Sequence, residues 1–164
     1  IHTRQALSGA GWRLLYDDDA LAGNVNPMIP GEEEKLIAEL KYLLGMEIPV
    51  VASCNRVSAR DGHFVSCGVE VEKETSVEEV LRLMNIPTLD LPSSPDQVNN
   101  IIEDSPNRED HLWIGEGMTT TVGNIRVDGN IIRFDALSHN TVRGAAGGVI
   151  LLAEFAVKES YITK

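Results

Sequence analysis

Residues 119–137, TTTVGNIRVDGNIIRFDAL, carry the clearest strand signal in the chain. Polar and apolar residues alternate over 119–127, which is typical of a strand with one buried face. Asp128-Gly129 follows, and this dipeptide favours a tight hairpin turn because such turns need a positive φ. Residues 131–137 then predict the returning strand. We therefore expect an antiparallel hairpin as one part of a sheet.

A second strand pair is expected nearer the N-terminus. Residues 48–57 predict a strand, Arg60-Asp61-Gly62 is turn-like, and residues 63–72 predict a second strand of alternating character. These two strands are expected to pair with each other as a hairpin. The stretch 87–108 is rich in Pro, Ser, Asn and Asp, and predicts a loop with one short strand over 98–103.

Two helices are expected between the strands. Gly31-Glu32-Glu33-Glu34 opens the first, in which apolar residues recur at three- and four-residue spacing until Gly45 provides a natural stop. Acidic residues suit this first turn because they face the positive end of the helix dipole. The second helix covers 77–84, since Ser76 and Glu79 have the spacing of a capping box.

A last helix is expected over 141–155, with Asn140 as its cap. It is apolar nearly all round, which predicts burial on more than one side. The glycine and alanine run at 144–148 is a poor helix former, so close packing against another surface must support it. Nothing else in the chain is large enough to cover both sides. We therefore expect a partner chain or a missing domain to do so.

The order of these elements predicts an α+β fold, a mainly antiparallel mixed sheet with helices on one face. Residues 1–30, with Pro27 and Pro30 at the end, are expected to be irregular. A length of 164 residues fits one ordinary domain.

Composition excludes several classes of function. The net charge of −11 argues against a nucleic-acid partner, because no basic stripe is available to neutralise phosphates. No apolar run reaches the ~20 residues that span a bilayer, so a soluble cytoplasmic protein without a membrane partner is expected. Cys54 and Cys67 lack the close spacing of a zinc site, and each lies in an apolar strand where a cysteine packs as a small hydrophobe. No metal is expected.

Arg56 and His63 are the first candidates for a functional site. They flank the predicted turn at 60–62, and strand ends are rigid supports for a site. Arg56 has the fork geometry to hold a carboxylate by two hydrogen bonds, and His63 titrates in the range that a general acid or base requires. From spacing alone, a surface charge and a turn histidine remain the plainer interpretation.

Two further segments are weaker signals on their own. Three carboxylates in the first turn of GEEEK, residues 31–35, are also expected of a solvated helix start. The glycines of QALSGAG, residues 5–11, allow close approach of the backbone to a ligand, but the segment is not a GxGxxG pattern.

Taken together, these segments are more specific. QALSGAG, GEEEK, NRVSARDGH at 55–63 and LSHNTVRGAAGG at 137–148, in that order, resemble the aspartate-semialdehyde dehydrogenase family in its archaeal and fungal branch. The resemblance covers about residues 1–156. It implies the C-terminal substrate-binding and dimerisation part of that enzyme, a domain like the C-terminal domain of glyceraldehyde-3-phosphate dehydrogenase that dimerises through its sheet.

The resemblance also implies a reaction, the NADP-dependent reductive removal of phosphate from aspartyl phosphate in amino-acid biosynthesis. A cysteine attacks the acyl carbon, with thiohemiacetal and thioester intermediates. Matched by motif, His63 would be the acid/base and Gln5 would orient the acyl group. Arg56 would hold the substrate α-carboxylate, Glu32 would meet the α-ammonium, and Lys35 would meet the phosphate.

For the cofactor, the resemblance implies contacts from Ser8, Gly9 and Asn140. Most of the NADP site and the nucleophilic cysteine belong to an N-terminal domain that this sequence lacks. We therefore expect residues 1–138 to bind substrate and dimerise, and 139–164 to pack on that absent domain. The isolated chain is expected to be inactive.

Two other functions stay open. A malonyl-coenzyme A reductase on the same scaffold also offers a carboxylate for Arg56, but its substrate has no α-ammonium and carries a thiol leaving group. A stand-alone dimerisation module without catalysis is the alternative of another class.

Overall fold

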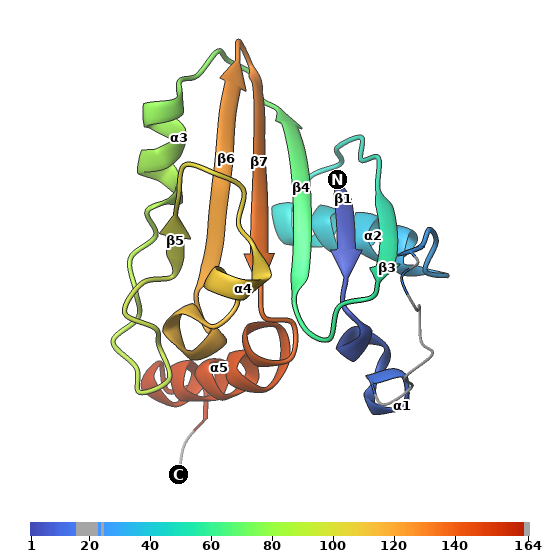
Figure 1. Ribbon diagram of the computed structural model, residues 1–164. Coiled ribbons are helices and arrows are strands. Elements are labelled where there is room, and N and C mark those ends of the chain that lie inside the picture. The colour runs from blue at the N-terminus through green and yellow to red at the C-terminus, as the bar shows by residue number, and fades with distance from the viewer. Residues whose placement is uncertain (16–22, 24, 163–164) are drawn as a thin grey trace.

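The computed structural model describes residues 1–15, 23 and 25–162 (Figure 1). These residues form a sheet of seven strands in the order β2-β3-β1-β4-β7-β6-β5. The parallel pairs β1–β3 and β5–β6 join four antiparallel pairs, so the sheet is mixed, as predicted. The strands are β1 (His2–Gln5), β2 (Val25–Asn26), β3 (Ser53–Val57), β4 (His63–Glu70), β5 (Asn99–Ile101), β6 (Thr120–Asp128) and β7 (Ile131–Ser138).

Helices lie around this sheet, with α2 behind β1 and β4 and α5 across the lower strand ends in the view of Figure 1. The short α4 lies in front of the sheet. No helix among the described residues has both the length and the apolar character to cross a bilayer. The helices are α1 (Trp12–Leu15), α2 (Glu32–Leu44), α3 (Val77–Met84), α4 (Arg108–His111) and α5 (Gly147–Lys158), with 3₁₀ turns at Leu7–Ala10 and Ile114–Gly117 and a π-helical turn at Val142–Ala146.

The predicted hairpin at 119–137 is confirmed as β6 and β7. Asp128 pairs with Ile131, and Gly129 between them has φ +59°, the left-handed conformation that the turn requires. The register shifts between Gly123 and Arg126, as at a β-bulge. The short strand predicted over 98–103 is also confirmed, as β5.

The second predicted hairpin is wrong in its pairing. Strands β3 and β4 both exist, but β1 lies between them, parallel to β3 and antiparallel to β4. The sequence of β1 is HTRQ, which shows no apolar alternation. Its backbone hydrogen bonds are satisfied by neighbours on both sides, and Thr3 is only 1% exposed. Tertiary pairing thus creates a strand that local pattern does not predict.

The expectation of irregular structure over residues 1–30 is corrected in the same way. Besides β1, this stretch contains a 3₁₀ turn, α1 and the two-residue β2. Residues 16–22 and 24 lie outside the described part of the chain. The strand predicted from residue 48 begins only at Ser53, and Val51 before it is exposed.

The two helix predictions at 31–45 and 77–84 are confirmed. Gly45 adopts φ +64° after α2 and its N–H caps the carbonyl of Lys41, so glycine ends the helix as expected. Ser76 Oγ accepts the N–H of Glu79 at the start of α3. The Glu79 carboxylate bonds Arg82 one turn later.

The last helix differs from expectation at its start. Thr141 precedes the π-helical turn at 142–146 and makes no side-chain cap, while the Asn140 side chain bonds other segments. In α5 Leu151 is buried, but Val149 and Leu152 are 66% and 65% exposed. Within the described chain, the burial predicted for this helix is therefore found on one side only.

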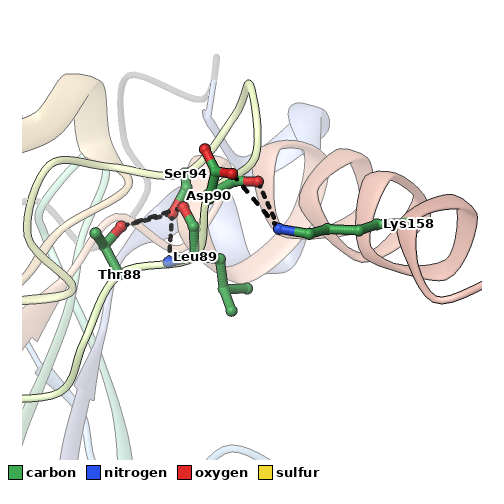
Figure 2. A network of polar contacts seen from close by, with 5 residues as sticks. All are labelled: Thr88, Leu89, Asp90, Ser94 and Lys158. Carbon is green, nitrogen blue, oxygen red and sulfur yellow. Dashed lines mark hydrogen bonds and ion pairs between the residues drawn. The ribbon is translucent and has the colours of Figure 1, made fainter.

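A loop fixes the far end of α5 (Figure 2). Lys158 Nζ donates to the Asp90 carbonyl at 3.0 Å and lies 3.8 Å from its carboxylate. Within this loop, residues 88–94, Ser94 Oγ lies 2.8 Å from Thr88 Oγ1 and accepts the Leu89 N–H at 3.2 Å. These bonds hold the two ends of the loop together.

A second set of hydrogen bonds joins the same loop to α5 one helical turn earlier. The Glu154 carboxylate accepts both the N–H and the Oγ–H of Ser93, at 2.9 and 2.8 Å. The position of α5 is thus set by polar bonds on one side while its apolar side stays open.

Two strand glycines allow a matched test of the sheet's packing. A Cβ at Gly123 in β6 would lie 2.0 Å from the Asp104 carbonyl oxygen, whereas one at Gly68 in β4 would meet nothing within 4 Å. We expect Gly123→Ala to lower the free energy of unfolding by about 2 kcal/mol or more. Gly68→Ala should stay within about 0.5 kcal/mol of the parent. Urea denaturation of both variants measures this, and equal stabilities would contradict the packing.

Candidate functional site

Three polar side chains form a row across adjacent strands. Gln5 at the end of β1 pairs with Arg56 of β3 on one side and with His63 of β4 on the other. Residues paired across neighbouring strands point to the same face of a sheet. Arg56 and His63 are therefore separated by two strand spacings, roughly 10 Å, with Gln5 between them.

The start of α2 adds a carboxylate to this row. Gln5 Nε2 donates to Glu32 Oε2 at 3.1 Å, and Lys35 Nζ lies 3.7 Å from Glu32 Oε1. Glu33 in the same helical turn accepts the backbone N–H of Cys54 at 3.1 Å, which anchors the helix start to β3. The acidic first turn is thus a structural support for the site as well as a complement to the helix dipole.

Gln5, His63, Glu32 and Lys35 border a cleft of about 530 Å³. Seven of the eight candidate residues from the sequence line it, and residues from α2, β4, the Ser8 turn and the π-helical turn contribute to its walls. Its lining is Gln5, Ala6, Ser8, Gly9, Glu32, Lys35, Leu36, Glu39, His63, Asn140, Thr141, Gly144 and Ala145.

Arg56 is the eighth candidate, and it lies beneath the wall of this cleft. It is only 7% exposed, and its Nη1 donates to the Ala6 carbonyl at 2.8 Å. A Cβ on Gly9 would come within 2.7 Å of the same nitrogen, so only glycine lets this turn pass so close to the guanidinium. Among the described residues Arg56 makes this one side-chain hydrogen bond, which leaves four of its five N–H donors for other partners.

His63 is poised as a neutral imidazole. Burial lowers its pKa from the ordinary 6.5; Glu32 opposes this shift and Arg56 adds to it. Its Nε2 is buried and has no hydrogen-bond partner within the described chain. A buried nitrogen without a partner is costly in a purely structural role, so this atom is suited to a bond with a ligand or with another part of the protein.

Glu32 is the charged counterpart. Its hydrogen bond from Gln5 lowers its pKa, Lys35 and Arg56 act in the same direction, and burial opposes them. Glu32 therefore stays ionised at neutral pH beside a neutral His63. Burial lowers the pKa of Arg56, while Glu32 opposes this.

The Ser8 turn and Asn140 close the other side of the cleft. Asn140 Nδ2 donates to Ser8 Oγ at 2.8 Å, and its Oδ1 accepts the Gly62 N–H at 2.7 Å. Small residues of the π-helical turn, Gly144 and Ala145, line the space next to them.

Part of the lining was not predicted from the sequence. Leu36 and Glu39 follow Lys35 along α2, and helical spacing from Glu32 was the available signal. Gly144 and Ala145 were noted only as poor helix formers that require close packing. Their small side chains also keep the cleft open beside Asn140.

The cleft combines the carboxylates of Glu32 and Glu39, the imidazole of His63, the amides of Gln5 and Asn140 and the ammonium of Lys35, with the Arg56 guanidinium beneath its wall. Such a set can bind a small molecule that carries both negative and positive groups, and can move a proton at its centre. Among the described residues, no three His, Cys, Asp or Glu side chains are grouped closely enough to hold a metal ion.

Comparison with known proteins gives a consistent result. Residues 1–143 match a family described as "Semialdehyde dehydrogenase, dimerisation domain". The aspartate-semialdehyde dehydrogenase of Archaeoglobus fulgidus is 42% identical over 99% of this chain and 51% of its own length. The malonyl CoA reductase (NADP) of Metallosphaera sedula is 32% identical over 100% of this chain and 52% of its own length.

A solved structure agrees. The crystal structure of aspartate semialdehyde dehydrogenase with NADP from Candida albicans matches with a TM-score of 0.81 and 32% identity, over 98% of this chain and 50% of that one. The chain thus spans about half the length of the relatives it matches.

The electrostatics of the row predict opposite effects of two substitutions. Glu32→Gln should lower the pKa of His63 further, because the carboxylate stabilises the imidazolium. Arg56→Gln should raise it, because a like charge is removed. NMR titration of the His63 ring measures both.

Glu34→Gln is the matched control, since Glu34 is an exposed carboxylate in the same helical turn. It should leave the His63 titration unchanged. Shifts of the same sign for Glu32→Gln and Arg56→Gln would contradict the geometry of the row.

Proposed function

Because the chain belongs to the semialdehyde dehydrogenase dimerisation-domain family, we propose that it is the substrate-binding and dimerisation part of an NADP-dependent aspartate-semialdehyde dehydrogenase. The full-length protein would reduce aspartyl phosphate to aspartate semialdehyde and release phosphate. The observation that carries the proposal is the row Arg56–Gln5–His63 with the Glu32 carboxylate bonded to its centre.

The charges of the cleft match those of aspartyl phosphate. Arg56 holds the α-carboxylate through its free N–H groups, since a guanidinium can give two parallel bonds to a carboxylate. Glu32, ionised at neutral pH, meets the α-ammonium. Lys35, on the same helix and lining the cleft, meets the phosphate as a point charge. The side chain of the substrate then lies along the row towards His63.

His63 is the acid/base of this reaction. As a neutral imidazole it accepts a proton from the attacking thiol, and it returns a proton to the substrate oxygen when that oxygen gains negative charge. Its Nε2, which has no hydrogen-bond partner among the described residues, supports this role. Gln5, which gives its N–H to Glu32, orients the acyl group beside His63.

The cofactor would meet the chain at Ser8 and Gly9. Gly9 has no Cβ, the turn is exposed there, and Gly144 and Ala145 beside it are small, so a flat ring fits against this wall. When bound, NADP supplies or accepts the hydride at the substrate carbon. The contribution of this chain is to orient that carbon and to hold a proton at His63.

The nucleophilic cysteine and most of the NADP site would belong to another domain. Neither Cys54 nor Cys67 lines the cleft. An apolar hollow of about 350 Å³ next to His63 and Asn140 is lined on one side by Gly144 of the π-helical turn. The exposed apolar side of α5 lies in the same C-terminal segment, residues 139–164. The hollow and this apolar side together support the proposal that the other domain packs on this segment. The isolated chain, which we place in the cytoplasm, would be inactive.

Residues 1–138 would also form the homodimer through the opposite face of the sheet. That face carries Arg4 stacked over Phe64, 5.2 Å from its ring centre, and a cleft of about 500 Å³ bordered by Asp135 and Arg108. In Figure 1 the upper parts of β4 and β7 have no helix in front of them. The part of this face that α4 leaves uncovered supports pairing with a second copy.

Malonyl-coenzyme A reduction is a second candidate, favoured by the identity to the Metallosphaera sedula enzyme. Arg56 would hold the free carboxylate of the malonyl group. That substrate carries no ammonium, so Glu32 would have no cationic partner in it. The Glu32 carboxylate, held in place by Gln5, therefore favours aspartyl phosphate over malonyl-coenzyme A as the substrate.

The activity assay is NADP reduction by the full-length protein with aspartate semialdehyde and phosphate. We expect His63→Asn to lower kcat by about 10²- to 10⁴-fold, the usual contribution of a general acid or base. In the parent, kcat/KM should fall with acid through a pKa below 6.5, because burial lowers that of His63. Full activity of His63→Asn would contradict the role.

Substitution of Arg56 tests the carboxylate clamp. Arg56→Lys keeps the charge and loses the paired hydrogen bonds, so kcat/KM should fall about tenfold or more. Arg60→Lys, at an exposed turn position nearby, is the control and should be neutral. Equal effects of the two substitutions would remove the basis for the clamp.

Glu32→Gln separates the two substrates. It should reduce turnover of aspartyl phosphate strongly, because a full charge opposite the ammonium is lost. Reduction of malonyl-coenzyme A should change little. If the protein turns over malonyl-coenzyme A faster than aspartyl phosphate, and Glu32→Gln does not change that rate, it is a malonyl-coenzyme A reductase.

A further inference from the structure

Asn140 joins three segments of the chain beside His63. Its Oδ1 accepts the N–H of Gly62, 78 positions earlier, at 2.7 Å. Its Nδ2 donates to Ser8 Oγ, 132 positions away, at 2.8 Å. Asn140 lies two residues after the end of β7 and two residues before the π-helical turn that precedes α5. One amide therefore connects the Ser8 turn, the turn before His63 and the C-terminal helix.

Gly62, the residue directly before His63, is held on every side. It is buried with φ +108°, which only glycine adopts without strain. A Cβ there would lie 2.9 Å from Arg108 Nη1 and 3.1 Å from Leu112 Cδ1. Its carbonyl accepts the Ala6 N–H at 3.2 Å. The direction in which the chain enters His63 is thus set by its N–H, its carbonyl and the packing around it.

The Ser8 turn belongs to the same unit. Leu7 N–H donates to the Ala59 carbonyl at 2.7 Å, and Ser8 N–H donates to the Arg60 carbonyl at 3.0 Å. The turn with the candidate cofactor contacts and the turn before His63 are therefore bonded to each other through the backbone. Asn140 fastens both to the C-terminal helix.

The amide of Asn140 is engaged through both of its polar atoms. Each of these atoms can make one further bond, but the two bonds already formed fix the amide against Gly62 and Ser8. We infer that Asn140 is a positioning residue, which acts through Gly62 to hold His63 beside Gln5 instead of recognising the cofactor itself. The measurement of kcat below rests on the proposed function, whereas the measurement of the His63 position does not.

The test uses the full-length protein with NADP and aspartate semialdehyde. Asn140→Leu keeps the shape and loses both bonds, so kcat should fall about tenfold to hundredfold, as expected of a catalytic group displaced by about 1 Å. The KM for NADP should stay within about twofold of the parent if the residue positions His63. A rise in the KM for NADP with kcat unchanged at saturation would overturn the inference.

Asn140→Asp is the conservative variant. Its carboxylate can still accept the Gly62 N–H, and it can accept the hydroxyl proton of Ser8. It should therefore retain kcat within about fivefold of the parent, with the acid limb of the pH profile moved upwards by the added negative charge. Loss of kcat equal to that of Asn140→Leu would count against positioning through Gly62.

Asn130→Leu is the matched control. Asn130 also donates from its side chain to backbone, to the Val71 carbonyl at 2.9 Å, but it lies at the far end of the β6–β7 hairpin. It should leave kcat unchanged. A drop as large as that of Asn140→Leu would show a general loss of stability and overturn the inference.

A second readout separates this inference from the proposed function. If the parent turns over neither acyl substrate, the proposed function fails, while the imidazole signals of His63 in isotope-labelled protein still report its placement. Asn140→Leu should shift these signals and Asn130→Leu should not. Unchanged His63 signals in a folded Asn140→Leu variant would overturn the inference whatever the activity.

Discussion

The site depends on the insertion of β1 between β3 and β4. This pairing sets Arg56, Gln5 and His63 side by side at one level of the sheet and on one face. Side chains alternate between the faces along a strand, so a slip of one residue would send a member of the row to the opposite face. The bond from Gln5 to Glu32 then holds α2 over the same spot. The chemistry proposed for the cleft follows from that register.

We propose different tasks for the two faces of the sheet. The row and the cleft face α2 and the π-helical turn. The exposed apolar residues of α5 follow that turn in the chain. Arg4, Phe64 and Asp135 lie on the other face, which we propose for the homodimer. A chain that spans about half the length of its relatives, with one face for a second copy and one for another domain, is consistent with the dimerisation-domain family to which it belongs.

Local patterns in the sequence predicted the elements that are stable for local reasons. The β6–β7 hairpin and α2 follow from alternation, helical spacing and glycine stops. Strand β1 has no such pattern, because its burial comes from neighbours distant in sequence. Asn140 has the residue type of a helix cap, yet its partners lie 78 and 132 positions away, beyond any local pattern. The grouping of Arg56, Glu32 and His63 was expected from the family resemblance, and their spacing alone left it open.

The most direct test of the account is a crystal structure of the full-length protein with aspartate semialdehyde bound. We expect the α-carboxylate within about 3.2 Å of the Arg56 guanidinium, a normal hydrogen-bond distance. The ammonium should face Glu32, and the aldehyde carbon should lie next to His63. A ligand bound outside this cleft, or one that reaches His63 without contacting Arg56, would contradict the central claim that the row acts as one site.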